Sequence, residues 1–87
     1  MGKGDIPEHF RRRIQEAKEK QLEELDLSND YRTDDKYKLT EIPEEVFELT
    51  HLKVLDLNHN KISYLPESLG NLTNLTELDL SVNQLTQ

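Results

Sequence analysis

Acidic side chains recur at equivalent places along this chain of 87 residues. The aspartates Asp26, Asp56 and Asp79 each stand between two leucines, and Glu24, Val54 and Glu77 stand two positions before them. A row of carboxylates can bind a basic partner, or each carboxylate can accept hydrogen bonds from the turn beside it. Both interpretations stay open from the sequence.

Catalytic and metal-binding chemistry finds little support in the sequence. His9, His51 and His59 stand in different contexts with no paired metal-ligand spacing. The chain has no cysteine, and its three glycines form no phosphate-binding loop. Asp30, Asp34 and Asp35 lack the spacing and the glycine of a calcium loop. We therefore expect no enzyme activity, no cofactor and no metal.

Regularly spaced leucines predict the elements that position the carboxylates. Leu52, Leu55 and Leu57 are followed by Asn60 and Ile62, and the same spacing restarts 23 residues later, since 75 − 52 = 23. The later copy contains Leu75, Leu78, Leu80, Asn83 and Leu85, and an earlier copy begins with Leu22, Leu25 and Leu27. Because side chains alternate along a strand, the leucines should point inward and the aspartates outward on a parallel sheet.

Asparagines should turn the chain out of each strand. An amide both donates and accepts hydrogen bonds, so Asn60 and Asn83 should form a ladder that satisfies their own turn and the next coil. Asp30 takes this place in the first copy, where a donor should be lost. Leu65, Leu69 and Leu72 should close the second coil, with Pro66 fixing the start of the return segment.

The first copy contains an insertion. Leu22 and Leu52 are 30 residues apart, seven more than the repeat, and the extra residues fall within 31–38. The register resumes with Leu39, Ile42, Pro43, Val46 and Leu49. Inserted loops often carry function, so Tyr31 and Tyr37 are candidates for a peptide contact, while a solvated loop is the plainer alternative.

A helix should precede the repeats. After a leader of residues 1–4, Asp5 is the expected N-cap of a helix within residues 5–20, and Glu8 completes a capping box. Ile6, Phe10, Ile14 and Ala17 form an apolar stripe that should cover the first coil. The basic triplet at 11–13 spans too wide an arc for one patch and is interpreted as the polar face of this helix.

Charge and composition narrow the choice of partners. The net charge is −7, with +2 on residues 1–20 and −9 on residues 21–87. An acidic body disfavours nucleic acid and anionic membranes and favours a protein with a basic surface. No apolar run is long enough for a membrane span, and no signal-peptide core is present. The absence of cysteines favours a cytoplasmic location.

The third copy stops at Gln87 without its return segment. We expect the edge formed by Leu78, Leu80 and Leu85 to be covered by a second copy, by a continuation of the chain, or by a partner.

The pattern LxxLxLxxNxLxxLPxxLxxL from Leu52 to Leu75 resembles the bacterial 23-residue leucine-rich repeat family. The segment from Ile6 to Ser28 resembles the caps that precede such repeats in cyanobacterial proteins, including those with Roco-type GTPase domains. The resemblance implies an α/β solenoid. In it, a capping helix precedes about two and a half repeats (22–51, 52–74 and 75–87), with a short parallel sheet on the concave face.

The resemblance also implies a non-catalytic module for protein–protein interaction, or alternatively a structural element that assembles through its uncapped edge. The candidate partner-binding residues are Glu24, Asp26, Lys53, Val54, Asp56, His59, Glu77, Asp79, Tyr31 and Tyr37.

Overall fold

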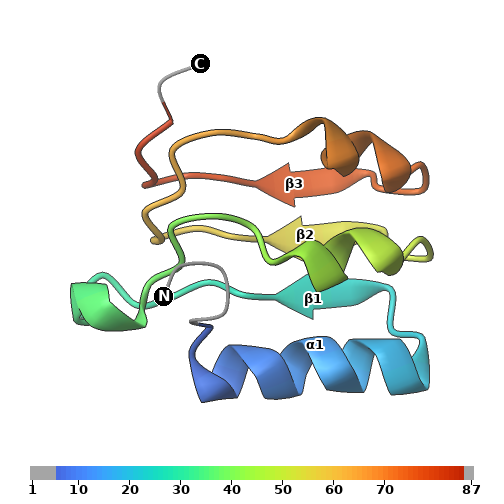
Figure 1. The fold of residues 1–87 in the computed structure, drawn as a ribbon, viewed down its shortest axis with the longest axis horizontal. Coiled ribbons are helices and arrows are strands. Elements are labelled where there is room, and N and C mark those ends of the chain that lie inside the picture. The colour runs from blue at the N-terminus through green and yellow to red at the C-terminus, as the bar shows by residue number, and fades with distance from the viewer. Residues whose placement is uncertain (1–5, 86–87) are drawn as a thin grey trace.

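The computed structural model describes residues 6–85 and contains one α-helix followed by a three-stranded parallel sheet (Figure 1). The helix is α1 (Glu8–Lys20), and the strands are β1 (Glu24–Asp26), β2 (Val54–Asp56) and β3 (Glu77–Asp79). Short 3₁₀ helices occupy the connections: η1 (Asp35–Tyr37), η2 (Glu44–Glu48) and η3 (Glu67–Asn71). The helix and the parallel sheet are as the sequence predicts.

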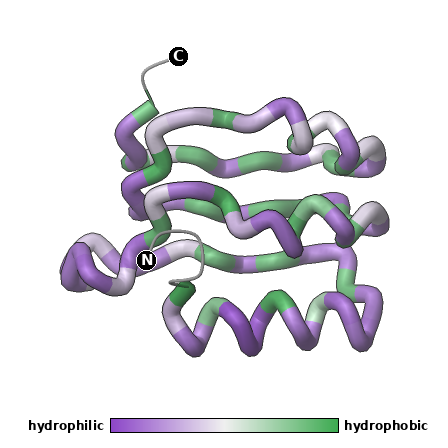
Figure 2. Tube along the Cα trace, viewed as in Figure 1, coloured by the Kyte–Doolittle hydropathy of each residue, from purple (hydrophilic) through white to green (hydrophobic). Residues whose placement is uncertain are grey.

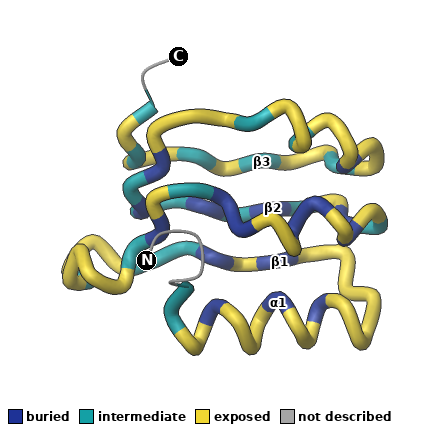
Figure 3. Tube along the Cα trace, viewed as in Figure 1, coloured by how far each residue is buried: buried dark blue, intermediate teal, exposed yellow. Residues whose placement is uncertain are grey.

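The sheet places equivalent residues of the three copies side by side. The strand order is β1-β2-β3, and Leu25, Leu55 and Leu78 are aligned across it. Leu25 and Leu55 are buried, whereas Leu78 is only partly buried because β3 has one neighbouring strand (Figure 3). The hydrophobic residues follow the strands and the facing side of α1 (Figure 2), so the core lies between the sheet, the return segments and the helix.

Helix α1 covers the first coil with Phe10, Ile14 and Ala17, all of them buried. It begins at Glu8 after Pro7, which makes no side-chain cap hydrogen bond, so Glu8 is not at the third helical position that a capping box requires. The expected cap residue Asp5 lies outside the described residues. Pro7 itself is the N-cap, and its carbonyl accepts the N–H groups of Phe10 and Arg11, so the helix begins without a side-chain cap.

The end of α1 corrects the prediction for Leu22. Gln21 is left-handed with φ 52°, and the N–H groups of Gln21 and Leu22 both donate to the carbonyl of Ala17. This turn leaves Leu22 37% exposed, whereas Leu52 at the same repeat position is fully buried. Leu22, the first residue of the first copy, therefore belongs to the C-terminal turn of α1 and does not pack into a coil as Leu52 does.

Arg13 ties the helix to the sheet. Its Nη1 donates to the carbonyl of Asp26 at 2.8 Å, and its guanidinium carbon lies 5.8 Å from the centre of the Phe10 ring. Arg12 instead pairs with Glu8 at 3.9 Å on the exposed surface. The basic triplet is thus not simply a solvated face, because one arginine covers a carbonyl at the edge of β1.

Asn60 is the one buried polar residue among the described residues, with 4% of its surface exposed. Its Nδ2 donates to the carbonyls of Leu27 at 2.9 Å and Leu57 at 3.0 Å, and its Oδ1 accepts the N–H of Leu39 at 2.8 Å. Leu27 and Leu39 belong to the preceding coil. The bond to its own turn is as predicted, but the prediction that this asparagine satisfies the next coil is wrong in direction, because Asn60 binds back to the coil before it.

Asn83 repeats this arrangement in the third coil. Its Nδ2 donates to the carbonyls of Leu57 and Leu80, and its Oδ1 accepts the N–H of Ile62 at 2.9 Å. The donor expected to be missing in the first coil is supplied by Asn29, whose Nδ2 donates to Oδ1 of Asn60 at 2.8 Å. Asn29 stands one residue before Asp30 in the sequence. The amide donor is therefore one position earlier than the repeat pattern predicts, and it still bonds to the asparagine of the second coil.

The return segments show where the core ends. In the first coil Ile42, Val46 and Leu49 are all buried. In the second coil Leu72 is buried, but Leu69 is only partly buried and Leu65 is 39% exposed. The prediction that Leu65 closes its coil is therefore wrong, since nothing in the described chain covers it from the side away from α1.

The open edge of β3 has backbone groups without a partner strand among the described residues, although the equivalent groups of the second coil pair with β3. The N–H of Leu57 donates to Asp79, and the carbonyl of Lys53 accepts from Thr76 and Glu77. The equivalent groups of the third coil, the N–H of Leu80 and the carbonyl of Thr76, pair with no backbone group of residues 6–85. Nearby, Val82 has φ 54°, a left-handed conformation that is strained for a β-branched side chain.

Candidate partner-binding face

The side chains between the inward leucines form one surface, which we call the strand face. It consists of Glu24, Asp26, Val54, Asp56, Glu77 and Asp79. The register aligns Glu24, Val54 and Glu77 in one row and Asp26, Asp56 and Asp79 in the next. The strand-face side chains of β1 and β3 are exposed, and those of β2 are half-buried. The structure thus brings together the two rows expected from the sequence.

Each aspartate of the strand face holds the turn that follows its strand. Oδ1 of Asp26 accepts the N–H of Ser28 at 2.9 Å, and Oδ1 of Asp79 accepts the N–H of Ser81 at 3.0 Å. The two serine hydroxyls donate to the same oxygens. Oδ1 of Asp56 accepts the N–H and Nδ2 of Asn58. The turn-building interpretation of the aspartates is therefore realised in the structure, and it orients all three carboxylates alike.

These hydrogen bonds stabilise the charged form of two carboxylates. Burial raises the pKa of Asp26, but the hydrogen bonds from Ser28 and the nearby charge of Arg13 outweigh it, and the pKa lies below its ordinary value. Hydrogen bonds from the hydroxyl and N–H of Ser81 lower the pKa of Asp79. The turns therefore favour the charged form of Asp26 and Asp79 more strongly than water favours that of an ordinary aspartate, although both lie in a row of like charges.

Lys53 and His59 flank the strand face. Nζ of Lys53 lies 3.6 Å from a carboxylate oxygen of Glu23, so its charge is partly balanced before any partner arrives. His59 is half-buried and left-handed with φ 58°, and its Nδ1 lies 2.7 Å from Oδ1 of Asn58. Its backbone N–H also donates to Ser81. His59 therefore belongs to the turn network as well as to the edge of the strand face.

The inserted loop lies apart from the strand rows and is anchored to the second coil. Asp35 lies 3.4 Å from Nζ of Lys38 and 3.6 Å from Nζ of Lys61. Tyr31 is 74% exposed with Arg32 beside its ring, and Tyr37 is also exposed with Lys36 beside its ring. Both tyrosines are accessible, but each already carries a cation on one face.

The acidic residues of the loop do not converge on one point. Oδ1 of Asp30 accepts the N–H of Arg32, and Asp35 is held by two lysines. Within residues 6–85 no group of three histidine, cysteine or acidic side chains is close enough to hold a metal ion. No helix in that range has the length and apolar character needed to cross a bilayer.

Near the strand face, the sequence analysis missed Asn29, and it placed Asn58 only as a residue flanking the strands without its hydrogen bond to Asp56. Asn29 bonds to Asn60, and Asn58 donates to Asp56. Asn29 precedes the expected repeat position by one, and Asn58 follows Asp56 by two where the other copies have serine. A search for polar residues two positions after each strand aspartate would have found Ser28, Asn58 and Ser81 together.

Comparison with known proteins agrees with this geometry. A family model described as leucine rich repeat matches residues 34–85, which is more than half of the chain. The chain therefore belongs to the leucine-rich repeat family. The matched span begins after β1, so α1 and the first strand lie outside it. A search of curated proteins gave no match.

Domains of this family generally mediate protein–protein interactions and are generally not enzymes.

Proposed function

We propose that this chain is a non-catalytic recognition module that binds a partner protein with a basic surface through the strand face. The observation that carries this proposal is the alignment of two acidic rows on a short parallel sheet. Glu24 and Glu77 flank the half-buried Val54, while the aspartates are oriented by their own turns. Fixed carboxylates around an apolar centre suit lysine or arginine side chains surrounding an apolar contact.

The family resemblance supports the finer parts of this proposal. The leucine spacing agrees with about two and a half stacked repeats that follow a capping helix of the cyanobacterial type. The lack of cysteine agrees with a cytoplasmic location. We place Tyr31 and Tyr37 at the margin of the interface, because they are exposed on a loop anchored to the second coil. Nucleic acid and anionic membranes are disfavoured as partners by the net charge of −7.

Charge reversal on the strand face tests the proposal. Glu24→Lys with Glu77→Lys leaves the turn-holding aspartates in place, and we expect it to reduce capture of the partner from a cell lysate by about tenfold or more. The matched control, Glu19→Lys with Glu67→Lys, makes the same change in charge on α1 and η3 and should capture as wild type does. Equal capture by both variants would contradict binding through the strand face.

A second candidate function is assembly through the open edge. The exposed Leu65 and Val82 and the partly buried leucines of the third coil favour it. A second copy or a further coil placed there would bury these residues and pair the N–H of Leu80. Light scattering during size exclusion separates the two candidates, because a monomer at micromolar concentration argues against self-assembly.

A further inference from the structure

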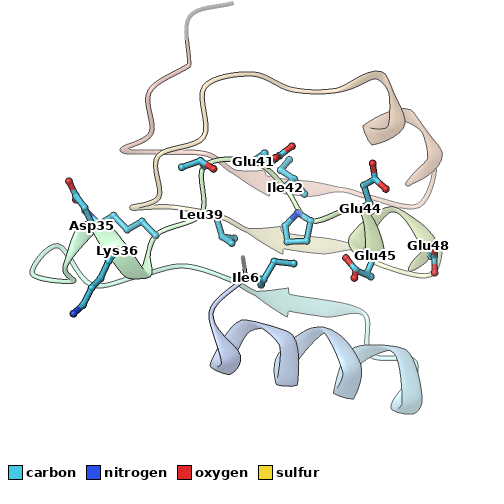
Figure 4. A pocket seen from close by; sticks show the side chains of 12 residues that line it. Ile6, Asp35, Lys36, Leu39, Glu41, Ile42, Glu44, Glu45 and Glu48 are labelled. Atoms are coloured by element: carbon cyan, nitrogen blue, oxygen red, sulfur yellow. The ribbon is translucent and has the colours of Figure 1, made fainter. Parts of the chain in front are cut away.

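A hollow of about 570 Å³ lies on the return-segment side of the sheet, away from the strand face (Figure 4). Leu39, Ile42 and Pro43 contribute apolar side chains from the first coil, and Ile6 contributes another from the residues preceding α1. Figure 4 shows Glu45 and Glu48 at one end of this hollow, and Asp35 and Lys36 of the insertion at the other. No residue of the three strands lines it, so it is separate from the proposed interface.

Hydrogen bonds and ion pairs hold the insertion end of the hollow in place. The N–H of Leu39 donates to Oδ1 of the buried Asn60, and its carbonyl accepts the N–H of Lys61 at 2.8 Å. Asp35 is held between Lys38 and Lys61, which anchors the insertion against the second coil. A site that needs no rearrangement loses little free energy in ordering its own residues on binding.

The charges of the hollow determine what it can bind. Its lining contains five carboxylates and two lysines, a net charge of −3. Glu45 and Glu48 are exposed and have no ion-pair partner within residues 6–85, whereas Asp35 is already paired. The carboxylates without an ion pair therefore lie at the η2 end, where Glu45 also borders a second hollow together with Arg11 and Arg12. A lysine or arginine side chain of a partner has the charge that complements these carboxylates.

We propose that this hollow binds an extended peptide segment of a partner that presents an arginine or lysine next to an aliphatic side chain. The cation pairs with Glu45 and Glu48, and the aliphatic group lies against the half-buried Ile6. The volume is in the range of known ligand sites and holds a few side chains but not a folded element. Because Leu39 and Ile42 are already buried, most of the affinity comes from charge and falls with added salt.

Titration of the ¹⁵N-labelled full chain with an acetylated peptide of sequence Gly-Leu-Ile-Arg-Arg-Gly tests this proposal by NMR. We expect saturable shifts at the amides of Ile42, Glu45 and Glu48, and none for a peptide with glutamine in place of arginine. Glu45→Gln with Glu48→Gln should weaken binding about fivefold or more. The matched control, Glu19→Gln with Glu67→Gln, makes the same change in net charge and should bind as wild type does.

Three results would overturn the proposal. Equal weakening by both double variants would mean that net charge alone attracts the peptide. Shifts confined to the strand face would place the peptide on the interface of the proposed function instead. Shifts at Ile42 and Glu45 that appear on raising the protein concentration without peptide would identify a second copy as the occupant. If Glu24→Lys with Glu77→Lys loses partner capture but still binds the peptide, the hollow and the strand face bind independently of each other.

Discussion

Replacing Asn60 by aspartate is expected to unfold most of the chain at neutral pH. The substitution keeps the size of the side chain but removes the Nδ2 donor that serves the carbonyls of Leu27 and Leu57. It also places a carboxylate where only 4% of the residue is exposed. A buried charge facing carbonyl oxygens costs about 3–5 kcal/mol, which is comparable to the whole stability of a small domain.

Asn83→Asp is the matched control for this substitution. Asn83 donates to equivalent carbonyls of Leu57 and Leu80, but it lies at the half-exposed end of the sheet, where water can replace lost hydrogen bonds. We expect a loss of about 1–2 kcal/mol there. Urea unfolding followed by circular dichroism measures both variants. A cost for Asn60→Asp no larger than that for Asn83→Asp would show that the buried asparagine does not hold the coils together.

Phe10→Ala should give the next largest loss of stability. The Phe10 side chain is fully buried between α1 and the first coil, with the guanidinium of Arg13 beside its ring. Removing a buried aromatic side chain costs about 3–5 kcal/mol, because apolar contacts are lost and a cavity remains. The helix is then expected to detach and expose Leu25 and Leu27, which the helix side of the core protects.

Phe10→Leu is the control for this prediction, since it keeps most of the apolar volume and should cost less than about 1.5 kcal/mol. Chemical unfolding gives the two free energies, and hydrogen exchange at the amide of Leu27 reports on β1, because this N–H donates to Asp56. If Phe10→Ala cost less than about 1 kcal/mol and left that amide protected, the helix would not be required to cover the first coil.

The leucine spacing predicted the sheet because a period-two pattern directly reflects which side of a strand is buried. Leu55 and Leu57 are fully buried, and Asp56 between them is on the other side. Leu22 and Leu65 also match leucine positions of the repeat pattern, but both are exposed. Burial there depends on a neighbouring element: the chain turns at the C-cap of α1 next to Leu22, and no segment of residues 6–85 covers Leu65.

The hydrogen-bond details were harder to predict than the leucines. An amide can bond to the coil on either side, and only the stacking order shows that Asn60 reaches back to Leu27 and Leu39. Asn29, and not the residue at position 30, donates to Asn60. This too depends on the backbone path after β1, which the spacing of residues alone does not give. The hollow beside η2 was not predicted, since it is formed by segments far apart in sequence around Ile6 and the insertion.

The strand face presents ionised carboxylates that are held by their own turns. A direct measurement is the titration of the aspartate carboxyl carbons of the folded chain by NMR. Because folding lowers the pKa of Asp26 and Asp79, these groups stabilise the fold above the ordinary aspartate range, and the contribution is lost as the pH falls through the folded-state values. We expect both to titrate below an ordinary aspartate. Values above it would show that burial or mutual repulsion outweighs the hydrogen bonds of the turns, and would contradict carboxylates that are held by their own turns.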